Sequence, residues 1–411
     1  MECSYFGKCG SCTLYTLDYV AQVEHKKAHM NTLFEPLHVK AFDYFQTPSE
    51  HYRGRSEFRI WKEGDTISYA MGAVDKKGAV CIDVCPKVEM KIYTLMPKLL
   101  KQIENSPLLR EKIFAIEFLA SSEHLLVTLI YHKPLHVEWD EEAKILEKEF
   151  GIFIIGRSRG IKRVLSQDFV EDRFDIAEKT YRYHIIEGGF SQPNRLMNQK
   201  MISWVLSHLE NCEDLLELYC GYGNFTIPMA GKFQKVLATE ISKTSIKSAL
   251  QNCELNDVHN IAFLRMSAEE LTSALKKERE YNRLVGINLE DYTFSHVFVD
   301  PPRSGMDEAS LEFISQFENI IYISCNPETL KRDLEMLTCN YTIEHFALFD
   351  QFPNTEHLES GVILKRLRSN CPQFQAYETY LPYPLSQGYL KDYGKLFHLK
   401  SSLLSDRSDR F

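Results

Sequence analysis

The chain has 411 residues, 44% of them hydrophobic and 26% charged, which is typical of an ordinary soluble globular protein with two or three domains. No apolar run approaches the roughly 18 residues of a membrane span. The first ten residues also lack the basic start and apolar core of a secretory signal. We therefore expect a cytoplasmic protein that does not act on a membrane.

The net charge of −9 does not indicate a nucleic-acid binder, because contacts to phosphate require Lys and Arg. Basic residues nevertheless form two local clusters: Arg53, Arg55 and Arg59, and then Arg157, Arg159, Lys162 and Arg163. Taken alone, such clusters are more often solvated surface than a binding site.

The first 45 residues combine a Cys- and Gly-rich loop, residues 1–12, with a predicted helix that Pro36 ends. The residues at helical spacing, which we expect on one face of that helix, are Leu14, Leu17, Val20, Ala21, Glu24 and Ala28.

From Tyr52 the chain changes to short runs rich in β-branched and aromatic residues, which predict strands. The strands are expected at Ser56–Trp61, Thr66–Gly72, Val80–Val84, Phe114–Leu119, Leu125–Tyr131, Ile152–Ile155 and Tyr181–Ile186, with helices near Ile92–Glu104 and Glu141–Phe150. Residues 46–187 are therefore predicted to form a mainly antiparallel α+β domain.

After Gln192 strands alternate with helices. The strands are expected at Asp214–Tyr219, Lys235–Glu240, Ile261–Met266, His296–Asp300, Ile320–Cys325, Thr342–Leu348 and Gly361–Arg366, and the helices from Phe225, at Thr244–Leu255, and near Ala268–Lys277, Glu308–Phe317 and Glu328–Leu337. Such alternation builds an α/β fold with a doubly wound, mostly parallel sheet, which we assign to residues 188–368. A polar, Tyr-rich tail follows over residues 369–411.

The first strand of this sheet ends in a glycine loop, Cys220-Gly-Tyr-Gly223, and the second ends in Glu240. Glycines let the backbone approach a ligand at the carboxyl edge of the sheet, and the acid can accept hydrogen bonds from ribose hydroxyls. The loop lacks the third glycine of the dinucleotide fingerprint. It therefore favours S-adenosylmethionine over NAD, although a plain strand–helix turn is a simpler alternative.

The fourth and fifth strands also end in polar residues. Asp300-Pro-Pro-Arg303 follows one strand, and its prolines stiffen a loop beside the expected ligand. Cys325 follows the other, just before a helix start, where we expect the thiol pKa to be lowered. Downstream, Asp350, Glu356 and Glu359 are candidates for a general base, and spacing alone does not choose among them.

With these residues the chain resembles the bacterial tRNA (uracil-5-)-methyltransferase family, within the RNA uridine C5-methyltransferase superfamily. The similarity runs from about Tyr52 to about Leu367. The motifs that carry it are His51–Arg53, Ser56–Trp61, Gln167–Arg173, Phe190–Asn194, Leu215–Phe225, Tyr281–Leu289, Asp300–Gly305, Ser324–Thr329 and Phe349–Pro353.

The resemblance implies that S-adenosylmethionine is bound by Gln192, Tyr219, Asn224, Glu240 and Asp300. It further implies that Cys325 is the nucleophile and Glu359 the base. The expected substrate is the T-loop uridine at position 54 of tRNA, bound through the T arm, with the T-loop-like uridine of tmRNA as a second substrate. Residues 46–187 would then recognise RNA and residues 188–368 would transfer the methyl group; no DNA is expected as a partner.

Eleven cysteines, an odd number at irregular spacing, do not indicate a disulfide framework. Cys3, Cys9, Cys12 and Cys85 resemble the [4Fe–4S] ligands of the ribosomal-RNA branch of the superfamily, so the chain here departs from the tRNA branch. Cysteine thiolates hold such clusters. Zinc and a metal-free set are alternatives, and Cys81 competes with Cys85 as the fourth ligand.

Three other functions are weighed against a tRNA methyltransferase. The cysteine set favours a ribosomal-RNA uridine C5-methyltransferase, whereas Tyr281–Leu289, Ser56–Trp61 and the lack of a separate N-terminal β-barrel favour tRNA. An RNA-binding protein without catalysis would have no need of Cys325 and Glu359. An amino-group methyltransferase would not need Cys325 either.

Overall fold

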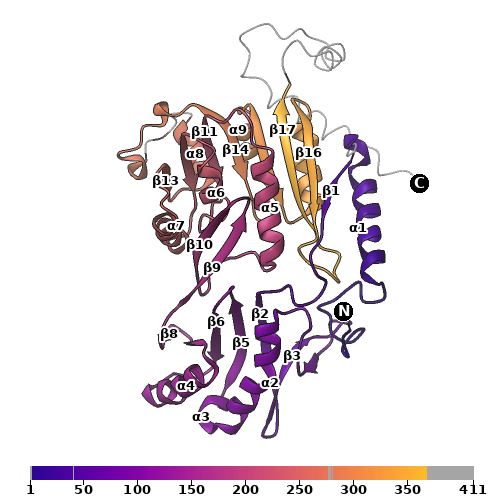
Figure 1. Cartoon of the computed structure of the whole chain (residues 1–411), viewed down its shortest axis with the longest axis vertical. Coiled ribbons are helices and arrows are strands. Elements are labelled where there is room, and N and C mark those ends of the chain that lie inside the picture. Colours follow the sequence, from indigo (N-terminus) through magenta and orange to yellow (C-terminus); the bar gives the residue numbers. More distant parts are fainter. Residues whose placement is uncertain (1, 40, 276–278, 280, 368–411) are drawn as a thin grey trace, which may run out of the picture. The chain divides into compact units, whose positions relative to one another are not determined.

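The computed structural model describes residues 2–39, 41–275, 279 and 281–367, and the predicted tail lies outside these residues. The described strands form sheets of eight, seven and two strands (Figure 1). Within this part of the chain, none of the helices has both the length and the apolarity needed to cross a membrane.

The eight-stranded sheet contains most of the C-terminal half and one strand from the N-terminal segment. Its strands are β1 (Asp43–Phe45), β11 (Asp214–Leu218), β12 (Lys235–Thr239), β13 (Ile261–Leu264), β14 (Phe294–Val299), β15 (Asn319–Ser324), β16 (Tyr341–Phe349) and β17 (Glu359–Arg366). Their order is β1-β16-β17-β15-β14-β11-β12-β13. Every pair is parallel except those of β17 with β15 and β16. This order confirms the predicted doubly wound, mostly parallel sheet.

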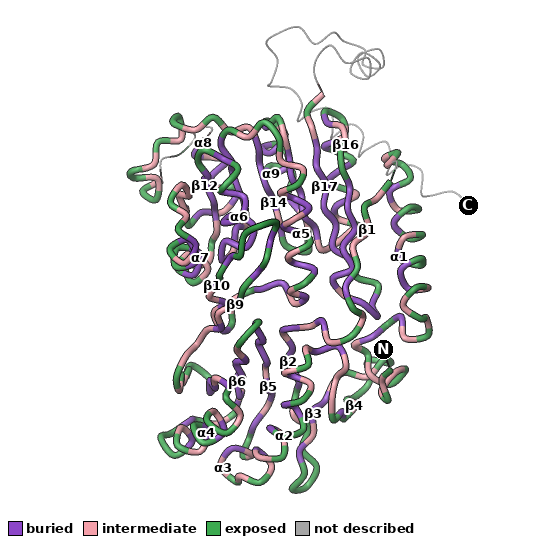
Figure 2. Tube along the Cα trace, viewed as in Figure 1, coloured by how far each residue is buried: buried purple, intermediate pink, exposed green. Residues whose placement is uncertain are grey.

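Helices cover the eight-stranded sheet, so its central strands are mostly apolar and buried. All five residues of β11 are buried, and Figure 2 shows the inner strands in the buried colour and the outer faces of the helices exposed. The helices are α1 (Tyr19–Phe34), α5 (Arg195–Ser207), α6 (Thr226–Ala230), α7 (Lys243–Leu255), α8 (Ala268–Leu275), α9 (Glu308–Ile314) and α10 (Pro327–Leu337), with short 3-10 turns at Glu35–Leu37, Asn282–Leu284 and Leu289–Asp291.

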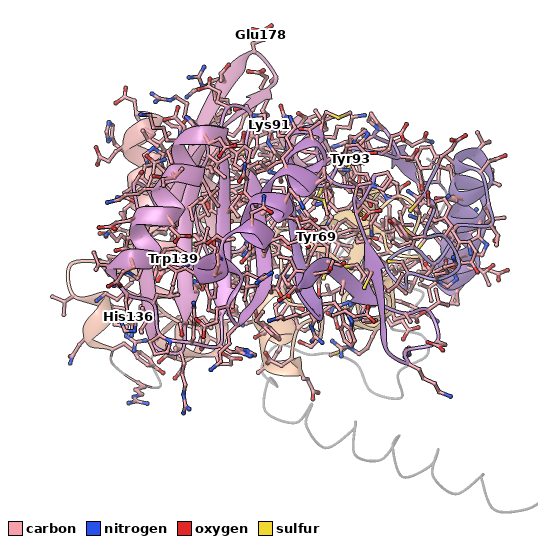
Figure 3. All side chains as sticks on the ribbon, turned by 90° about the horizontal axis from the view of Figure 1, so that it is seen from below. Tyr69, Lys91, Tyr93, His136, Trp139 and Glu178 are labelled. Carbon is pink, nitrogen blue, oxygen red and sulfur yellow. The ribbon has the colours of Figure 1, made fainter. Side chains whose placement is uncertain are left out.

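The seven-stranded sheet is mainly antiparallel, as predicted, and has helices on one face. Its strands are β2 (Arg55–Glu63), β3 (Thr66–Gly72), β4 (Ala79–Ile82), β5 (Ile113–Ala120), β6 (Leu125–Tyr131), β7 (Phe153–Ser158) and β8 (Ile161–Val164), and its helices are α2 (Met90–Asn105), α3 (Pro107–Arg110) and α4 (Val137–Phe150). Figure 3 looks onto these helices and labels two residues of the core, Tyr69 of β3 and Trp139 of α4. The Tyr69 hydroxyl donates to the carbonyl of Met96 in α2 at 2.9 Å, which ties this helix to the sheet.

A two-stranded hairpin, β9 (Phe169–Ile176) and β10 (Lys179–Ile186), shares a hydrophobic core with α5 and the eight-stranded sheet. Val170, Phe174 and Tyr183 of the hairpin belong to the same buried cluster as Met201 and Leu215. The domain boundaries predicted at residues 45/46 and 187/188 stay a prediction.

Most predicted elements lie within a few residues of their observed bounds, with two differences. The sequence did not predict β1, α5, β8 or β9. The predicted inner face of α1 is wrong, because Val20 is 75% exposed whereas Gln22 and Lys26 are buried. The predicted helix near Ala268–Lys277 is found over Ala268–Leu275, and its last two predicted residues lie outside the described part of the chain.

Candidate active site

The predicted site residues gather at the carboxyl edge of the eight-stranded sheet. Tyr219, Glu240, Asp300 and Cys325 each come directly after the last residue of β11, β12, β14 or β15. Because β17 runs antiparallel to β15, with Ser324 opposite Ser360, its first residue, Glu359, lies at the same edge as Cys325. The structure therefore brings the predicted nucleophile and base together.

Cys325 lies between β15 and the N-terminus of α10, and its thiol is half-buried. The pKa of the thiol is raised to about 11, mainly by burial and also by the carboxyl groups of Glu359 and Asp300, while Arg303 opposes the increase. The expectation that the helix start lowers this pKa is wrong for the protein alone, because desolvation and two nearby acids outweigh it. In the protein alone, the raised pKa favours the protonated thiol at neutral pH.

Glu359 and Asp300 are neighbouring acids with raised pKa values. Glu359 is 4% exposed, and its Oε2 has no hydrogen-bond partner among the described residues. Burial raises its pKa well above the ordinary value, Asp300 adds to this effect, and Arg303 opposes it. Burial alone raises the pKa of Asp300 to about 7. Acids with perturbed pKa values in this position are typical of a functional site.

The glycine loop after β11 has the backbone conformation that its sequence predicts. Gly223 has φ +87°, and a Cβ there would lie 3.0 Å from Ile227 Cδ1. Tyr219, with φ +64°, also lies in the left-handed region, which is uncommon for a residue with a side chain. Glu240 braces the loop, since its Oε2 accepts from the Gly221 N–H at 3.1 Å and its Oε1 from the Ser242 N–H at 2.7 Å. Carboxylate oxygens have further lone pairs, so Glu240 keeps acceptor capacity for a ribose.

Gln192 and Asn224, the remaining predicted cofactor ligands, are both 8% exposed and already paired. Gln192 Oε1 accepts from Gln351 Nε2 at 2.6 Å. The Asn224 side chain exchanges two hydrogen bonds with Asn198, at 2.8 and 2.9 Å, and accepts from the Tyr222 hydroxyl at 3.0 Å. Asn224 therefore fixes the glycine loop to α5 in this structure.

Two buried polar residues at this edge were not predicted. Glu217, the last but one residue of β11, is 1% exposed, and burial raises its pKa to about 8. Gln351 is fully buried. In the described part of the chain, Glu217 Oε2 and Gln351 Oε1 have no hydrogen-bond partner, which marks both as candidates to contact a ligand. The sequence feature that could have identified Glu217 is an acidic residue inside a mostly apolar strand.

The four predicted metal ligands also come together. Cys3, Cys9, Cys12 and Cys85 line one small cavity beside Lys87. Cys81 lies exposed on β4, so the cavity favours Cys85 as the fourth member. Burial raises the pKa of Cys12 to about 11, the other three cysteines contribute, and Lys87 opposes them. Among the described residues, no group of three or more His, Cys, Asp or Glu is arranged to hold a metal ion, so the prediction of a bound cluster is unsupported.

The second basic cluster is largely neutralised by acids. Arg157 donates to Glu187, Arg163 to Asp140, and Lys162 lies 2.8 Å from Asp168. In the first cluster Arg55 pairs with Glu117 at 2.6 Å. Paired surface charges of this kind contribute less to phosphate binding than free ones.

A groove of about 700 Å³ lies beside α5 and β1. Trp204, Lys200 and Asp175 are among its lining residues, and none of the predicted site residues lines it. The chemistry at the sheet edge therefore identifies the candidate site better than cavity size does.

Comparisons with known proteins identify the family of this chain. A family model described as tRNA (Uracil-5-)-methyltransferase matches residues 18–367. The chain belongs to the tRNA (uracil-5-)-methyltransferase family. A tRNA/tmRNA (uracil-C(5))-methyltransferase of Sulfurovum sp. (strain NBC37-1) is 50% identical over 370 residues, which cover 89% of this chain and 100% of that protein. A protein of the same name from Neisseria meningitidis serogroup C (strain 053442) is 49% identical over 85% of this chain and 97% of its own length.

A solved structure has the same fold. It is the Pyrococcus abyssi tRNA (uracil-54, C5)-methyltransferase in complex with S-adenosyl-L-homocysteine, with a TM-score of 0.68 and 22% sequence identity over 86% of this chain and 85% of that one. At this identity the similarity supports the fold, and the family model and the sequence relatives support the enzyme class.

Proposed function

We propose that this protein transfers a methyl group from S-adenosylmethionine to carbon 5 of the T-loop uridine, position 54, of tRNA, and to the corresponding uridine of tmRNA, in the cytoplasm. The observation that carries the proposal is the placement of Cys325, directly after β15, and of Glu359, the first residue of the neighbouring antiparallel strand β17, close to the acid Asp300. A thiol and a buried base at one sheet edge provide the two groups that methylation of a uracil carbon requires.

Carbon 5 of uracil is too weak a nucleophile to take a methyl group unaided. In the proposed reaction Cys325, as the thiolate, adds to carbon 6 and moves electron density to carbon 5, which can then attack a methyl group. Glu359 removes the carbon 5 proton, and the Cys325–carbon 6 bond breaks to release the product. The raised pKa of Glu359 makes it a strong proton acceptor once it is ionised.

S-adenosylmethionine, when bound, supplies the methyl group and a positive sulfonium charge. The residues proposed to hold it are Gln192, Tyr219, Asn224, Glu240 and Asp300. A positive charge near Cys325 would lower the thiol pKa from its value of about 11, so occupancy of this site would favour the thiolate. The unpartnered oxygen of Glu217 fits a cationic group of the same ligand.

The target uridine must leave its stack to reach the sheet edge, at a cost of a few kcal/mol. Loop shape is expected to guide this choice more than duplex sequence, because proteins recognise unstacked bases in RNA loops.

The test is to incubate the purified protein with S-adenosylmethionine and unmodified tRNA, tmRNA and ribosomal RNA, and to map 5-methyluridine. We expect methylation of the T-loop uridine alone in tRNA and of its counterpart in tmRNA. Methylation of ribosomal RNA only would support the ribosomal-RNA alternative, and RNA binding without methylation would contradict the proposal.

We also propose that Cys3, Cys9, Cys12 and Cys85 hold a [4Fe–4S] cluster. Support comes from the donor chemistry, four thiols around one cavity, and from the positive charge of Lys87, which favours thiolates. The cluster would be structural, because these residues are not part of the sheet edge that carries Cys325.

Anaerobic purification followed by iron analysis and visible absorbance tests this second proposal. We expect iron in the wild type and its loss in Cys12→Ser, whereas the matched control Cys81→Ser should keep it. Zinc in place of iron would favour the zinc alternative, and a wild type without either metal would rule out both.

A further inference from the structure

The loop of residues 350–358, which joins β16 to the base-bearing strand β17, is held by the N-terminal part of the chain. In Figure 1 it lies beside the first turns of α1. The Tyr52 hydroxyl donates to the Pro353 carbonyl at 3.0 Å. The Thr13 and Leu14 N–H groups donate to the Asn354 carbonyl at 2.9 and 3.1 Å. Partners more than 300 residues away in sequence thus fix the backbone just before Glu359.

Lys26 of α1 makes the central contacts to this loop. Its side chain is 1% exposed, and its ammonium group donates to Asp350 Oδ1 at 2.7 Å and to the carbonyls of Phe352 and His357 at 3.2 Å each. These three acceptors use all three N–H bonds of a lysine. The other oxygen of Asp350, which is fully buried, accepts from the Tyr19 hydroxyl at 2.9 Å.

Stability alone is a weak reason for such a pair, because a buried ion pair must offset the desolvation of both charges, and apolar residues of similar volume often serve as well. The placement of the acceptors indicates a second role. Asp350 directly follows β16, and His357 lies two residues before Glu359. One ammonium group therefore fixes both ends of the loop and with them the point at which Glu359 enters β17.

We propose that Lys26 is a positioning residue for Glu359: it holds the 350–358 loop so that the carboxyl group meets the uracil bound to Cys325. This inference rests on the proposed methyltransferase function. Cys325 itself is held by other residues, so loss of Lys26 should impair removal of the carbon 5 proton and leave formation of the adduct unchanged.

Lys26→Met tests this directly. Since a misplacement of about 1 Å can reduce a rate by about 10²-fold, we expect kcat to fall by roughly that factor, with KM for tRNA unchanged within about threefold. A covalent protein–RNA species should accumulate with ordinary tRNA, and the adduct with 5-fluorouridine RNA should form at the wild-type rate. The matched control is Lys27→Met, because Lys27 is the next residue of α1 and pairs with Glu24 on the surface at 3.1 Å.

A second variant separates positioning from stability. In Lys26→Met/Asp350→Asn no buried charge is left alone, so the melting temperature should return toward that of the wild type. The carbonyls of Phe352 and His357 still lack their donor, so turnover should stay slow. Recovery of turnover together with stability would overturn the positioning role, as would normal turnover of Lys26→Met.

If Lys26→Met does not fold, Gln22→Met provides the test. Gln22 Oε1 accepts from the Asn354 N–H at 2.9 Å, and its Nε2 donates to Asn354 Oδ1 at 3.2 Å, so it holds the same loop without a charge. We expect about tenfold slower turnover with the same accumulation of adduct, and an unchanged rate would overturn the inference. A wild type that forms no adduct with 5-fluorouridine RNA would instead contradict the proposed function.

Discussion

The proposed nucleophile, Cys325, and the proposed base, Glu359, are held by different parts of the chain. The corner of Cys325 is fixed locally: Asn326 Nδ2 donates to the Arg303 carbonyl at 3.0 Å, and Ser324 Oγ to the Asn326 carbonyl at 3.1 Å. The loop before Glu359 is fixed by Lys26, Tyr52 and the Thr13–Leu14 backbone, far away in sequence.

Substitutions in these two regions should therefore impair different steps of the proposed reaction. A change near Cys325 should affect the first covalent step, and a change in the N-terminal segment should affect the last one. In the proposed mechanism, methyl transfer would depend on residues outside the eight-stranded sheet as well as on its edge.

The largest effect is expected from Cys325→Ala. This variant should show no methylation and no denaturation-resistant adduct with 5-fluorouridine RNA, because the bond to carbon 6 cannot form. Denaturing gel electrophoresis of the RNA–protein mixture measures the adduct. If the adduct persisted, the assignment of Cys325 as the nucleophile would be wrong.

Glu359→Gln should slow turnover by about 10² to 10⁴-fold, the usual range for loss of a general base. Adduct formation should continue, so a covalent protein–RNA species should accumulate with ordinary tRNA. Single-turnover kinetics with a quenched time course separates the two steps. Turnover at the wild-type rate would show that another group is the base.

Glu217→Gln tests whether the folded protein keeps the buried Glu217 carboxyl group protonated, through the pH dependence of stability. The folded protein keeps the Glu217 proton up to about pH 8, whereas the unfolded chain releases it near the ordinary pKa of 4.5. The wild type should therefore lose stability as the pH rises between these values, and the variant should lose less, by on the order of 4 kcal/mol at pH 8.

Urea denaturation without cofactor at pH 5 and pH 8 measures this difference. Parallel pH profiles of the wild type and Glu217→Gln would show that Glu217 is not held protonated in the fold.

Asp333→Asn should have the smallest effect. It should impair formation of the adduct, whereas Lys26→Met should impair proton removal. Asp333 Oδ2 accepts from the Tyr322 hydroxyl at 2.6 Å and from the Met306 N–H at 3.1 Å, which ties the 300–306 loop to α10. Weakening one charged, buried hydrogen bond should cost about 1–3 kcal/mol of stability. The rate of adduct formation should fall a few-fold, and proton removal should not. A selective slowing of product release would contradict local control of Cys325.

Much of the fold and the candidate site could be predicted because the signals were local. Apolar runs and glycine turns predicted β11, β14 and β15. Cys325 and Asp300 directly follow two of these strands, so the strand pattern alone placed both residues at one edge of the sheet. Family motifs added Glu359, which the spacing of Asp350, Glu356 and Glu359 did not single out.

The sequence by itself thus determined the doubly wound sheet, the enzyme family and the residues at the sheet edge. Only the tertiary structure decided that α1 buries Gln22 and Lys26 and exposes Val20, that burial raises the thiol pKa, and that four scattered cysteines share a cavity. The physical reason is that apolar periodicity predicts which face is hydrophobic. It carries no information about a buried lysine whose partners lie more than 300 residues away, or about the desolvation that the assembled site imposes.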